Sequence, residues 1–181
     1  LKGFTLENLE NTDPKLIKEM RDFYFDQIEN YKKNKNKKIT IDKMPLNLVH
    51  VGEILRFFPN AKFILALRHP YDCVLSCFMQ NFMLNHAMAN FLNLDDSLNL
   101  YDLTMSLWKK YTNVFKIDHH LIRYEDVVSN FKKTIGDLLK FLNVKWSDNV
   151  IEFYKTAEKR GIINTPSYNQ VSQPIYSNSM Y

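Results

Sequence analysis

The chain has 181 residues, enough for one domain with a hydrophobic core, and its 45% hydrophobic and 24% charged residues are ordinary for a globular protein. No stretch approaches the ~20 consecutive apolar residues of a membrane-spanning helix, so no membrane span is predicted. The net charge of +4 depends on five lysines within residues 32–38. Without them 19 basic residues face 20 acidic ones, which argues against a nucleic-acid-binding surface.

The N-terminal part of the chain predicts two helices and one strand. Asn11-Thr12-Asp13-Pro14 is a helix-start pattern, and apolar residues then recur at helical spacing as far as Tyr31. The lysine-rich segment that follows is interpreted as a solvated loop. Residues 38–41 form a short predicted strand, which Asp42-Lys-Met-Pro45 ends, and residues 46–58 have the periodicity of a helix.

A second strand is predicted at residues 62–67, a continuous apolar run that is typical of a strand covered on both faces in a parallel sheet. Arg68-His-Pro70 ends it. Helices are predicted over residues 70–82 and over residues 96–115.

The third predicted strand covers residues 119–123 and is closed by Tyr124-Glu-Asp126; helices at about 129–143 and 147–158 and an irregular segment from residue 159 follow. Strands that alternate with helices indicate an α/β fold with a parallel sheet. Three strands alone leave apolar edges open. We therefore expect either further strands or a larger domain, and a homo-oligomer could cover the open edge.

The clearest functional signal lies in the predicted strand, turn and helix of residues 64–78. In open α/β sheets ligands bind at the carboxyl ends of strands, where a helix N-terminus offers N–H groups to an anion. Arg68 lies at that strand end with a planar guanidinium that suits a phosphate, and Ser76 follows on the helix with its side chain tilted back toward the N-terminus. The alternative is an arginine paired with a carboxylate and a serine bonded to its own helix.

A lysine and the scarcity of glycine complete the local evidence. Lys43 follows the strand predicted at residues 38–41, where it would add a compact positive charge at the same edge of the sheet; a solvated lysine is the alternative. Only four glycines occur, and no two have the spacing of a glycine-rich phosphate loop.

Several motifs occur in a fixed order along the chain. They are Asp42-Lys-Met-Pro45, residues 57–78 with Arg68-His-Pro and Ser76, Leu121-Ile-Arg-Tyr-Glu-Asp-Val127, and the tail Thr165-Pro-Ser-Tyr-Asn-Gln-Val-Ser-Gln-Pro174. Together they resemble the sulfotransferase superfamily, with the bacterial sulfotransferases linked to tetratricopeptide repeats and the protein-tyrosine sulfotransferases as nearest kin. The resemblance covers nearly the whole chain from Lys38 onward.

The resemblance implies both a fold and a reaction. We expect residues 1–181 to form a single, partial sulfotransferase domain with a three-layer α/β fold and a mostly parallel sheet of the P-loop nucleotide-binding type. The family transfers a sulfuryl group from 3′-phosphoadenosine 5′-phosphosulfate (PAPS) to a hydroxyl or amine, and no metal is required. The class of the acceptor stays open.

The resemblance also implies roles for individual residues. Arg68 and Ser76 would hold the 3′-phosphate of the nucleotide, and Tyr124 would contact the nucleotide. Lys43 would act catalytically on the transferring sulfuryl group. A closing loop would include the following tail residues: Thr165, Ser167 and Gln170.

The sequence departs from the family pattern in three places. No segment resembles the family's Pro-Arg-Ser-Gly-Thr-Thr loop for the 5′-phosphosulfate, so we expect a C-terminal part without the first strand, weak nucleotide binding and no activity. Met44 stands where cytosolic relatives carry a histidine base, so no general base is identified. Gln80 stands where tyrosine sulfotransferases have a third basic phosphate contact. A non-catalytic sulfotransferase-like binding module is therefore the alternative.

Two further groups of residues are interpreted as structural. Cys73 and Cys77 do not have the spacing of a metal site or a disulfide scaffold, so we interpret them as buried small hydrophobes in a chain from a reducing compartment, the cytoplasm. The Met and Phe residues between 78 and 91 are interpreted as core, with the lining of an acceptor pocket as the alternative.

Overall fold

The computed structural model describes residues 11–31, 39–155 and 173–175. The chain divides into two compact units, each of which is described by itself. The first contains Leu1–Ala61 and Thr104–Asp118, and the second contains Lys62–Leu103 and His119–Tyr181. Helix α5, Leu94–Val114, contributes its first part to the second unit and its last part to the first unit.

The first unit begins with helix α2, Pro14–Tyr31, which confirms the predicted helix and its start at Pro14. The Asp13 carboxylate accepts a hydrogen bond from the backbone N–H of Lys15 at 2.8 Å, so it satisfies one of the donors that a helix start leaves without a partner. The Arg21 side chain donates to the Phe57 carbonyl at 2.7 Å. This bond ties α2 to the end of helix α3.

The strand predicted at residues 38–41 is wrong for the residues that the structure describes. Residues 39–44 have no regular secondary structure, and the side chains of Ile39 and Ile41 are 50% and 73% exposed. A strand forms only where its backbone pairs with a neighbour, and the described sheet has two strands, neither of them in this segment. The apolar alternation was therefore not sufficient to identify a strand.

The helix predicted over residues 46–58 is confirmed, with a change of helix type. A 3-10 helix covers Pro45–His50, and α3 continues from it over Val51–Phe57. The N–H of Asn47 bonds to the Met44 carbonyl at 3.0 Å, the shorter-range bond of a 3-10 turn. Proline suits the first helical position because its missing N–H would have no partner there.

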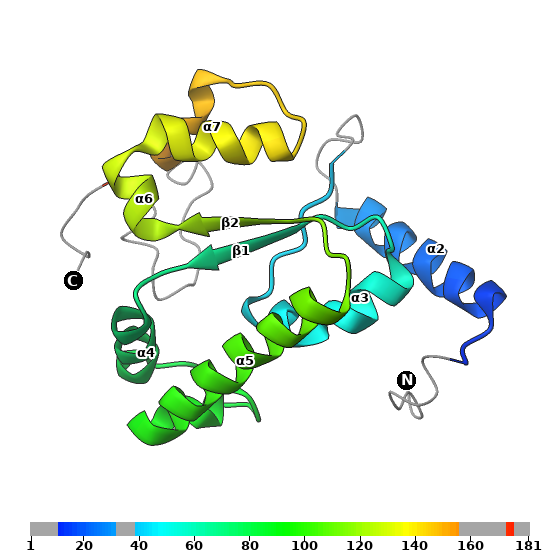
Figure 1. The fold of residues 1–181 in the computed structure, drawn as a ribbon, viewed down its shortest axis with the longest axis horizontal. Coiled ribbons are helices and arrows are strands. Elements are labelled where there is room, and N and C mark those ends of the chain that lie inside the picture. The colour runs from blue at the N-terminus through cyan, green and yellow to red at the C-terminus, as the bar shows by residue number, and fades with distance from the viewer. Residues whose placement is uncertain (1–10, 32–38, 156–172, 176–181) are drawn as a thin grey trace. The chain divides into compact units, whose positions relative to one another are not determined.

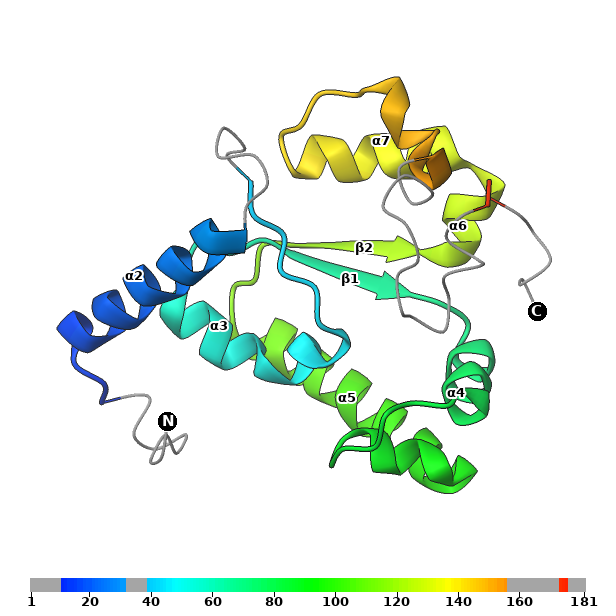
Figure 2. The same ribbon diagram turned by 180° about the vertical axis from the view of Figure 1, so that it is seen from behind.

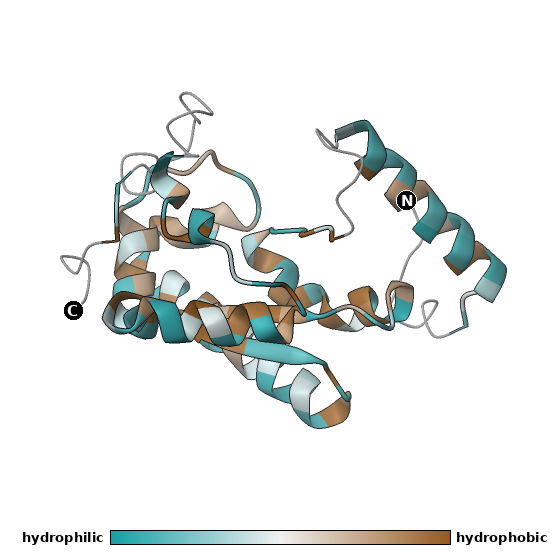
Figure 3. Ribbon diagram, turned by 90° about the horizontal axis from the view of Figure 1, so that it is seen from above, coloured by the Kyte–Doolittle hydropathy of each residue, from teal (hydrophilic) through white to brown (hydrophobic). Residues whose placement is uncertain are grey.

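The core of the first unit lies where α3 meets the last part of α5. Val51 is 1% exposed and Trp108 is 7% exposed, and the Tyr111 hydroxyl donates to the Val49 carbonyl at 2.9 Å. Brown and teal residues alternate along the helices in Figure 3, as expected for elements that bury one side and expose the other.

The second unit is built on two parallel strands, β1 (Phe63–Leu67) and β2 (His119–Arg123), which are paired from Phe63↔His119 to Leu67↔Arg123. Figure 1 shows the two arrows side by side and pointing the same way. Both strands and their parallel direction were predicted, so the mixed α/β class is confirmed.

The sequence predicted that β1 is covered on both of its faces, and this prediction is wrong. Burial alternates along β1, and Ile64 is 38% exposed. Helix α7, Phe131–Phe141, packs against β2, where the rings of His120 and Phe141 stack with centroids 5.4 Å apart.

The helices that follow the two strands position the candidate site. Helix α4, Pro70–Met79, begins directly after β1 and ends three residues earlier than predicted; Gln80, which follows, is extended. Helix α6, Tyr124–Ser129, begins directly after β2, where the sequence predicted only a turn. Figure 2 shows both helices leaving the same end of the sheet.

The remaining elements agree with the sequence in outline. Helices α5 and α7 confirm the predicted helices at 96–115 and 129–143, and a 3-10 turn at Met88–Leu92 precedes α5. The helix predicted at 147–158 appears as a 3-10 turn, Asp148–Val150, and a helical segment at 153–155; the rest lies outside the described residues. None of the described helices combines the length and the apolar character needed to cross a membrane.

Candidate anion-binding site at the ends of two strands

The carboxyl ends of β1 and β2 bring Arg68 and Tyr124 together. The strand register pairs Leu67 with Arg123, so the next residue of each chain segment leaves the sheet at the same edge. The guanidinium carbon of Arg68 lies 5.2 Å from the centroid of the Tyr124 ring, within the range of a cation–π contact. Two residues 56 positions apart therefore form one contact, with the aromatic ring orienting the cation.

Arg68 also contacts a carboxylate. Its Nε lies 3.6 Å from Oδ2 of Asp72 in the first turn of α4, and the two side chains are 33% and 17% exposed. The carboxylate pairing that the sequence offered as an alternative is thus present. A guanidinium carries five N–H donors in a planar fork, so one carboxylate and one bound anion can share it.

Ser76 lies on the same side of α4 as this ion pair. It follows Asp72 by four residues, and residues four apart lie one above the other on a helix face. Its side chain is half-buried. The hydroxyl is therefore one helical turn beyond the carboxylate that contacts Arg68, with its side chain tilted toward the N-terminus of α4.

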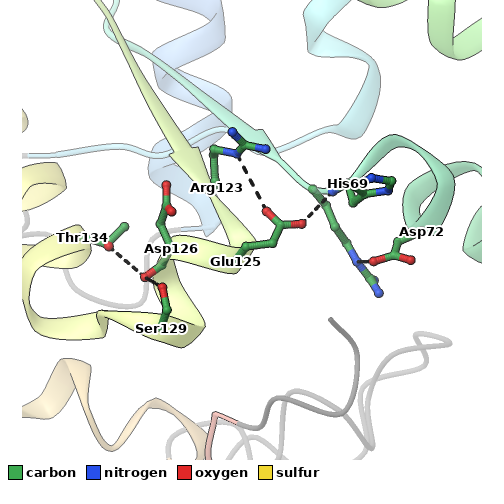
Figure 4. Close-up of polar contacts among 8 residues, drawn as sticks. His69, Asp72, Arg123, Glu125, Asp126, Ser129 and Thr134 are labelled. Atoms are coloured by element: carbon green, nitrogen blue, oxygen red, sulfur yellow. Dashed lines mark hydrogen bonds and ion pairs between the residues drawn. The ribbon is translucent and has the colours of Figure 1, made fainter. Parts of the chain in front are cut away.

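A carboxylate that the sequence reasoning did not select connects the two strand ends. Oε1 of Glu125 accepts a hydrogen bond from the backbone N–H of His69 at 2.7 Å, and Oε2 lies 4.0 Å from Nε of Arg123. Figure 4 shows the Glu125 side chain extending between Arg123 and His69. Hydrogen bonds from its own backbone N–H and that of His69, together with the charge of Arg123, hold the pKa of Glu125 below its usual value although burial raises it.

The two cysteines, Cys73 and Cys77, lie on α4 after Arg68 and interact with each other. Both are half-buried, so they are less buried than the sequence predicted. A hydrogen bond from the Cys77 thiol and the positive charge of Arg68 together lower the pKa of Cys73 from 9.0 to about 7, against the effect of burial. The same hydrogen bond raises the pKa of Cys77, because a thiol that donates its proton holds it more tightly.

The other predicted site residues belong to the first unit or fall outside the described residues. Lys43 is exposed and belongs to the first unit, next to Asp42, whose carboxylate accepts a hydrogen bond from the Tyr24 hydroxyl at 2.8 Å. Burial, with this hydrogen bond and the nearby charge, raises the pKa of Tyr24 to about 12. Three predicted residues of the tail fall outside the described part of the chain: Thr165, Ser167 and Gln170.

A small cavity of about 120 Å³ lies beyond the end of α4 in the second unit. Phe82 and Phe91 line it, with their ring centroids 5.3 Å apart. Part of the Met and Phe cluster therefore lines a hollow. Its lining residues are Gln80, Asn81, Phe82, Leu84, Met88, Phe91 and Leu92. Among the described residues, no group of three or more His, Cys, Asp or Glu side chains could hold a metal ion.

Asp72 and Glu125 are the two residues of this site that sequence reasoning missed. Asp72 could have been found from its spacing, because it follows Arg68 by four residues in the first turn of a predicted helix. Glu125 directly follows Tyr124 in the motif already selected, but its partner is a backbone N–H. A backbone partner leaves no sequence signal.

Comparison with known proteins supports the resemblance that the motifs indicated. The chain matches the family described as "Sulfotransferase family" over residues 4–148. It is similar to an uncharacterized protein of Aquifex aeolicus (strain VF5), at 31% identity over 172 residues, which are 93% of this chain and 22% of that protein. It is also similar to protein-tyrosine sulfotransferase 2 of Gallus gallus, at 26% identity over 146 residues, which are 74% of this chain and 37% of that protein.

These matches decide the family but not the whole protein's activity. The chain spans 22% and 37% of the length of the two curated relatives, so it corresponds to one portion of each. The family match nevertheless includes both strands and both strand ends of the site, from Arg68 to Glu125. The chain belongs to the sulfotransferase family.

Proposed function

We propose that this chain provides the 3′-phosphate half of the donor site of a PAPS-dependent sulfotransferase, on a sheet of the P-loop nucleotide-binding type. The protein would transfer the sulfuryl group to a hydroxyl or amine acceptor. Membership of the family supports sulfuryl transfer in general. The observation that supports the donor assignment is the position of Arg68, at the carboxyl end of β1, 5.2 Å from the Tyr124 ring and at the start of α4.

The proposed phosphate contacts combine three kinds of donor. The Arg68 guanidinium supplies charge and a planar pair of N–H groups, and the Ser76 hydroxyl supplies a neutral donor from the same side of α4. The N-terminus of this ten-residue helix adds a favourable electrostatic field for an anion. Tyr124 would contact the nucleotide while its ring orients Arg68.

The proposed reaction is an in-line displacement at sulfur. The acceptor oxygen or nitrogen bonds to sulfur and loses its proton, while the bond from sulfur to the bridging oxygen breaks and leaves adenosine 3′,5′-bisphosphate. Such transfers depend on positioning and on neutralising the charge that develops on the leaving oxygen. Lys43 is the proposed source of that positive charge, and Thr165, Ser167 and Gln170 belong to the proposed closing loop.

Recognition of the 3′-phosphate would serve positioning rather than chemistry. This phosphate takes no part in bond making, so its binding energy can fix the donor in the reactive orientation. The proposal therefore predicts a clear preference for a nucleotide with a 3′-phosphate over the same nucleotide without one.

The test is calorimetric titration with adenosine 3′,5′-bisphosphate and with adenosine 5′-monophosphate. We expect the wild-type chain to prefer the bisphosphate, and Arg68→Ala to reduce that preference about 10- to 100-fold, the loss typical of a hydrogen bond to a charged group. Lys140→Ala is the control, because it removes one positive charge from an exposed position in the last turn of α7, and it should keep the preference. Equal affinities in the wild-type chain would contradict the proposal and favour the non-catalytic binding module.

A further inference from the structure

The turn between β1 and α4 depends on one backbone hydrogen bond to a side chain. Only Arg68 and His69 separate the strand from the helix, and Pro70 has no N–H to donate. His69 precedes the first helical residue, and its own side chain makes no capping hydrogen bond. Its backbone N–H donates instead to Glu125 at 2.7 Å. The residue next to Arg68 is thus tied to the neighbouring strand end.

Glu125 is itself held on a fixed element. The Asp126 carbonyl next to it accepts hydrogen bonds from the Thr134 hydroxyl of α7 at 3.0 Å and from the Asn130 backbone at 2.9 Å. Figure 4 shows Thr134 and Ser129 converging on this carbonyl. Helix α6 is therefore fastened to α7, and Glu125 extends from a supported helix toward His69.

The second oxygen of Glu125 shows that this carboxylate is not an ordinary surface group. Oε2 is buried and has no hydrogen-bond partner among the described residues, with Arg123 at 4.0 Å as the nearest recorded opposite charge. Placing a carboxylate oxygen out of water without a hydrogen bond is costly. The bond to the His69 N–H and the charge of Arg123 offset part of that cost.

We propose that Glu125 is a positioning residue for the 3′-phosphate site: it clamps the His69 backbone and so fixes the turn that presents Arg68 and the first turn of α4 to the phosphate. This inference rests on the proposed function, and Glu125 itself touches no substrate atom. A turn that is already fixed loses less conformational freedom when the phosphate binds, so affinity and selectivity increase.

The reach of the side chain, not its charge, carries this role. A carboxylate beside an anion site repels the anion, so the charge of Glu125 alone would weaken phosphate binding. Two variants separate the two properties. Glu125→Gln keeps the length and an acceptor oxygen but removes the charge, whereas Glu125→Asp keeps the charge but shortens the side chain by one methylene.

The experiment measures the affinity ratio of adenosine 3′,5′-bisphosphate to adenosine 5′-monophosphate in the wild-type chain and in both variants. We expect Glu125→Gln to keep or raise the wild-type ratio and Glu125→Asp to lower it about 3- to 10-fold, the cost of ordering a turn and one long side chain. Tyr111→Phe is the matched control, because it removes a side-chain hydrogen bond to a backbone carbonyl of the first unit and leaves His69 and α6 unchanged. It should lower the melting temperature and leave the ratio unchanged.

Hydrogen exchange of the His69 amide provides a second readout that needs no nucleotide. This amide should exchange slowly in the wild-type chain and in Glu125→Gln and faster in Glu125→Asp. The proposed clamp is overturned if Glu125→Asp keeps the wild-type affinity ratio of the two nucleotides, or if both variants lower this ratio equally. A wild-type chain without any preference for the bisphosphate overturns the proposed function instead, and the positioning role falls with it even where the His69 amide is protected.

Discussion

The guanidinium carbon of Arg68 lies 5.2 Å from the centroid of the Tyr124 ring, so the first residues after two paired strands form a cation–π contact. This contact explains how a flexible arginine is held at the sheet edge. The ion pair with Asp72 at 3.6 Å holds it from the side of α4. Together the ring and the carboxylate orient an arginine that lies two residues before the first residue of α4.

The role of the Tyr124 ring can be separated from that of its hydroxyl. Tyr124→Leu removes the aromatic face, so we expect the preference for adenosine 3′,5′-bisphosphate to fall about 2- to 5-fold, the strength of a partly exposed cation–π contact. Tyr124→Phe keeps the face and should keep the preference. Calorimetry with both nucleotides measures this difference, and an equal loss in the two variants would show that the hydroxyl is responsible.

Asp72 should oppose phosphate binding while it stabilises α4. Asp72→Asn removes a negative charge beside Arg68, and we expect the bisphosphate to bind about 2- to 5-fold more tightly at low salt. The same change removes an acidic residue from the first turn of α4, which should lower the free energy of unfolding by about 0.3–1 kcal/mol. Titration and urea unfolding measure the two effects. Weaker binding in Asp72→Asn would indicate that the carboxylate serves mainly to orient Arg68.

The cysteine pair predicts a reactive thiol at neutral pH. Because the pKa of Cys73 is lowered to about 7, its alkylation by iodoacetamide should rise through a midpoint near pH 7, where the thiol loses its proton. Cys77 should react much more slowly, since its pKa is raised. Peptide mapping by mass spectrometry at a series of pH values measures both rates.

The matched variant for this prediction is Cys77→Ala. It removes the hydrogen-bond donor that lowers the pKa of Cys73, so the midpoint should move upward toward the ordinary value of 9.0. An unchanged midpoint in Cys77→Ala would show that Arg68, not Cys77, activates the thiol.

Two glycines within helices should respond differently to a methyl group. A Cβ added at Gly136 in α7 meets nothing within 4 Å, so Gly136→Ala should raise the free energy of unfolding by about 0.5–1 kcal/mol through helix propensity. At Gly52 the same atom would lie 3.3 Å from Cε1 of Tyr111, whose hydroxyl is bonded to Val49. Gly52→Ala should therefore raise the free energy of unfolding by less than Gly136→Ala. Chemical denaturation of both variants tests this order, and an equal gain would contradict it.

The sequence predicted the elements whose pattern is local and strong. The apolar run that became β1, the His119–Arg123 strand and the long periodic helices all appear close to their predicted positions. Residues 39–41 are all β-branched and still do not form a strand, because a strand also requires a partner that no local pattern reveals. The sequence also did not predict the helix that begins at Tyr124, because its six residues are too few to show a helical periodicity.

The candidate site was predictable only as far as side-chain chemistry allowed. Arg68 was selected from its position at a strand end and Tyr124 from the family resemblance, and the parallel register places them in contact. The bond from His69 to Glu125 joins a backbone group to a residue 56 positions away, so no spacing in the sequence indicates it. The interaction between Cys73 and Cys77 follows from their i,i+4 spacing, but their partial exposure does not.

The most direct test of this account is ³¹P nuclear magnetic resonance of adenosine 3′,5′-bisphosphate during titration with the chain, because the two phosphates give separate signals. We predict that the 3′-phosphate signal shifts on binding to the wild-type chain and that Arg68→Ala abolishes this shift. A titration in which only the 5′-phosphate signal moves, or in which Arg68→Ala leaves the 3′-phosphate shift intact, would contradict the assignment of this strand end to the 3′-phosphate.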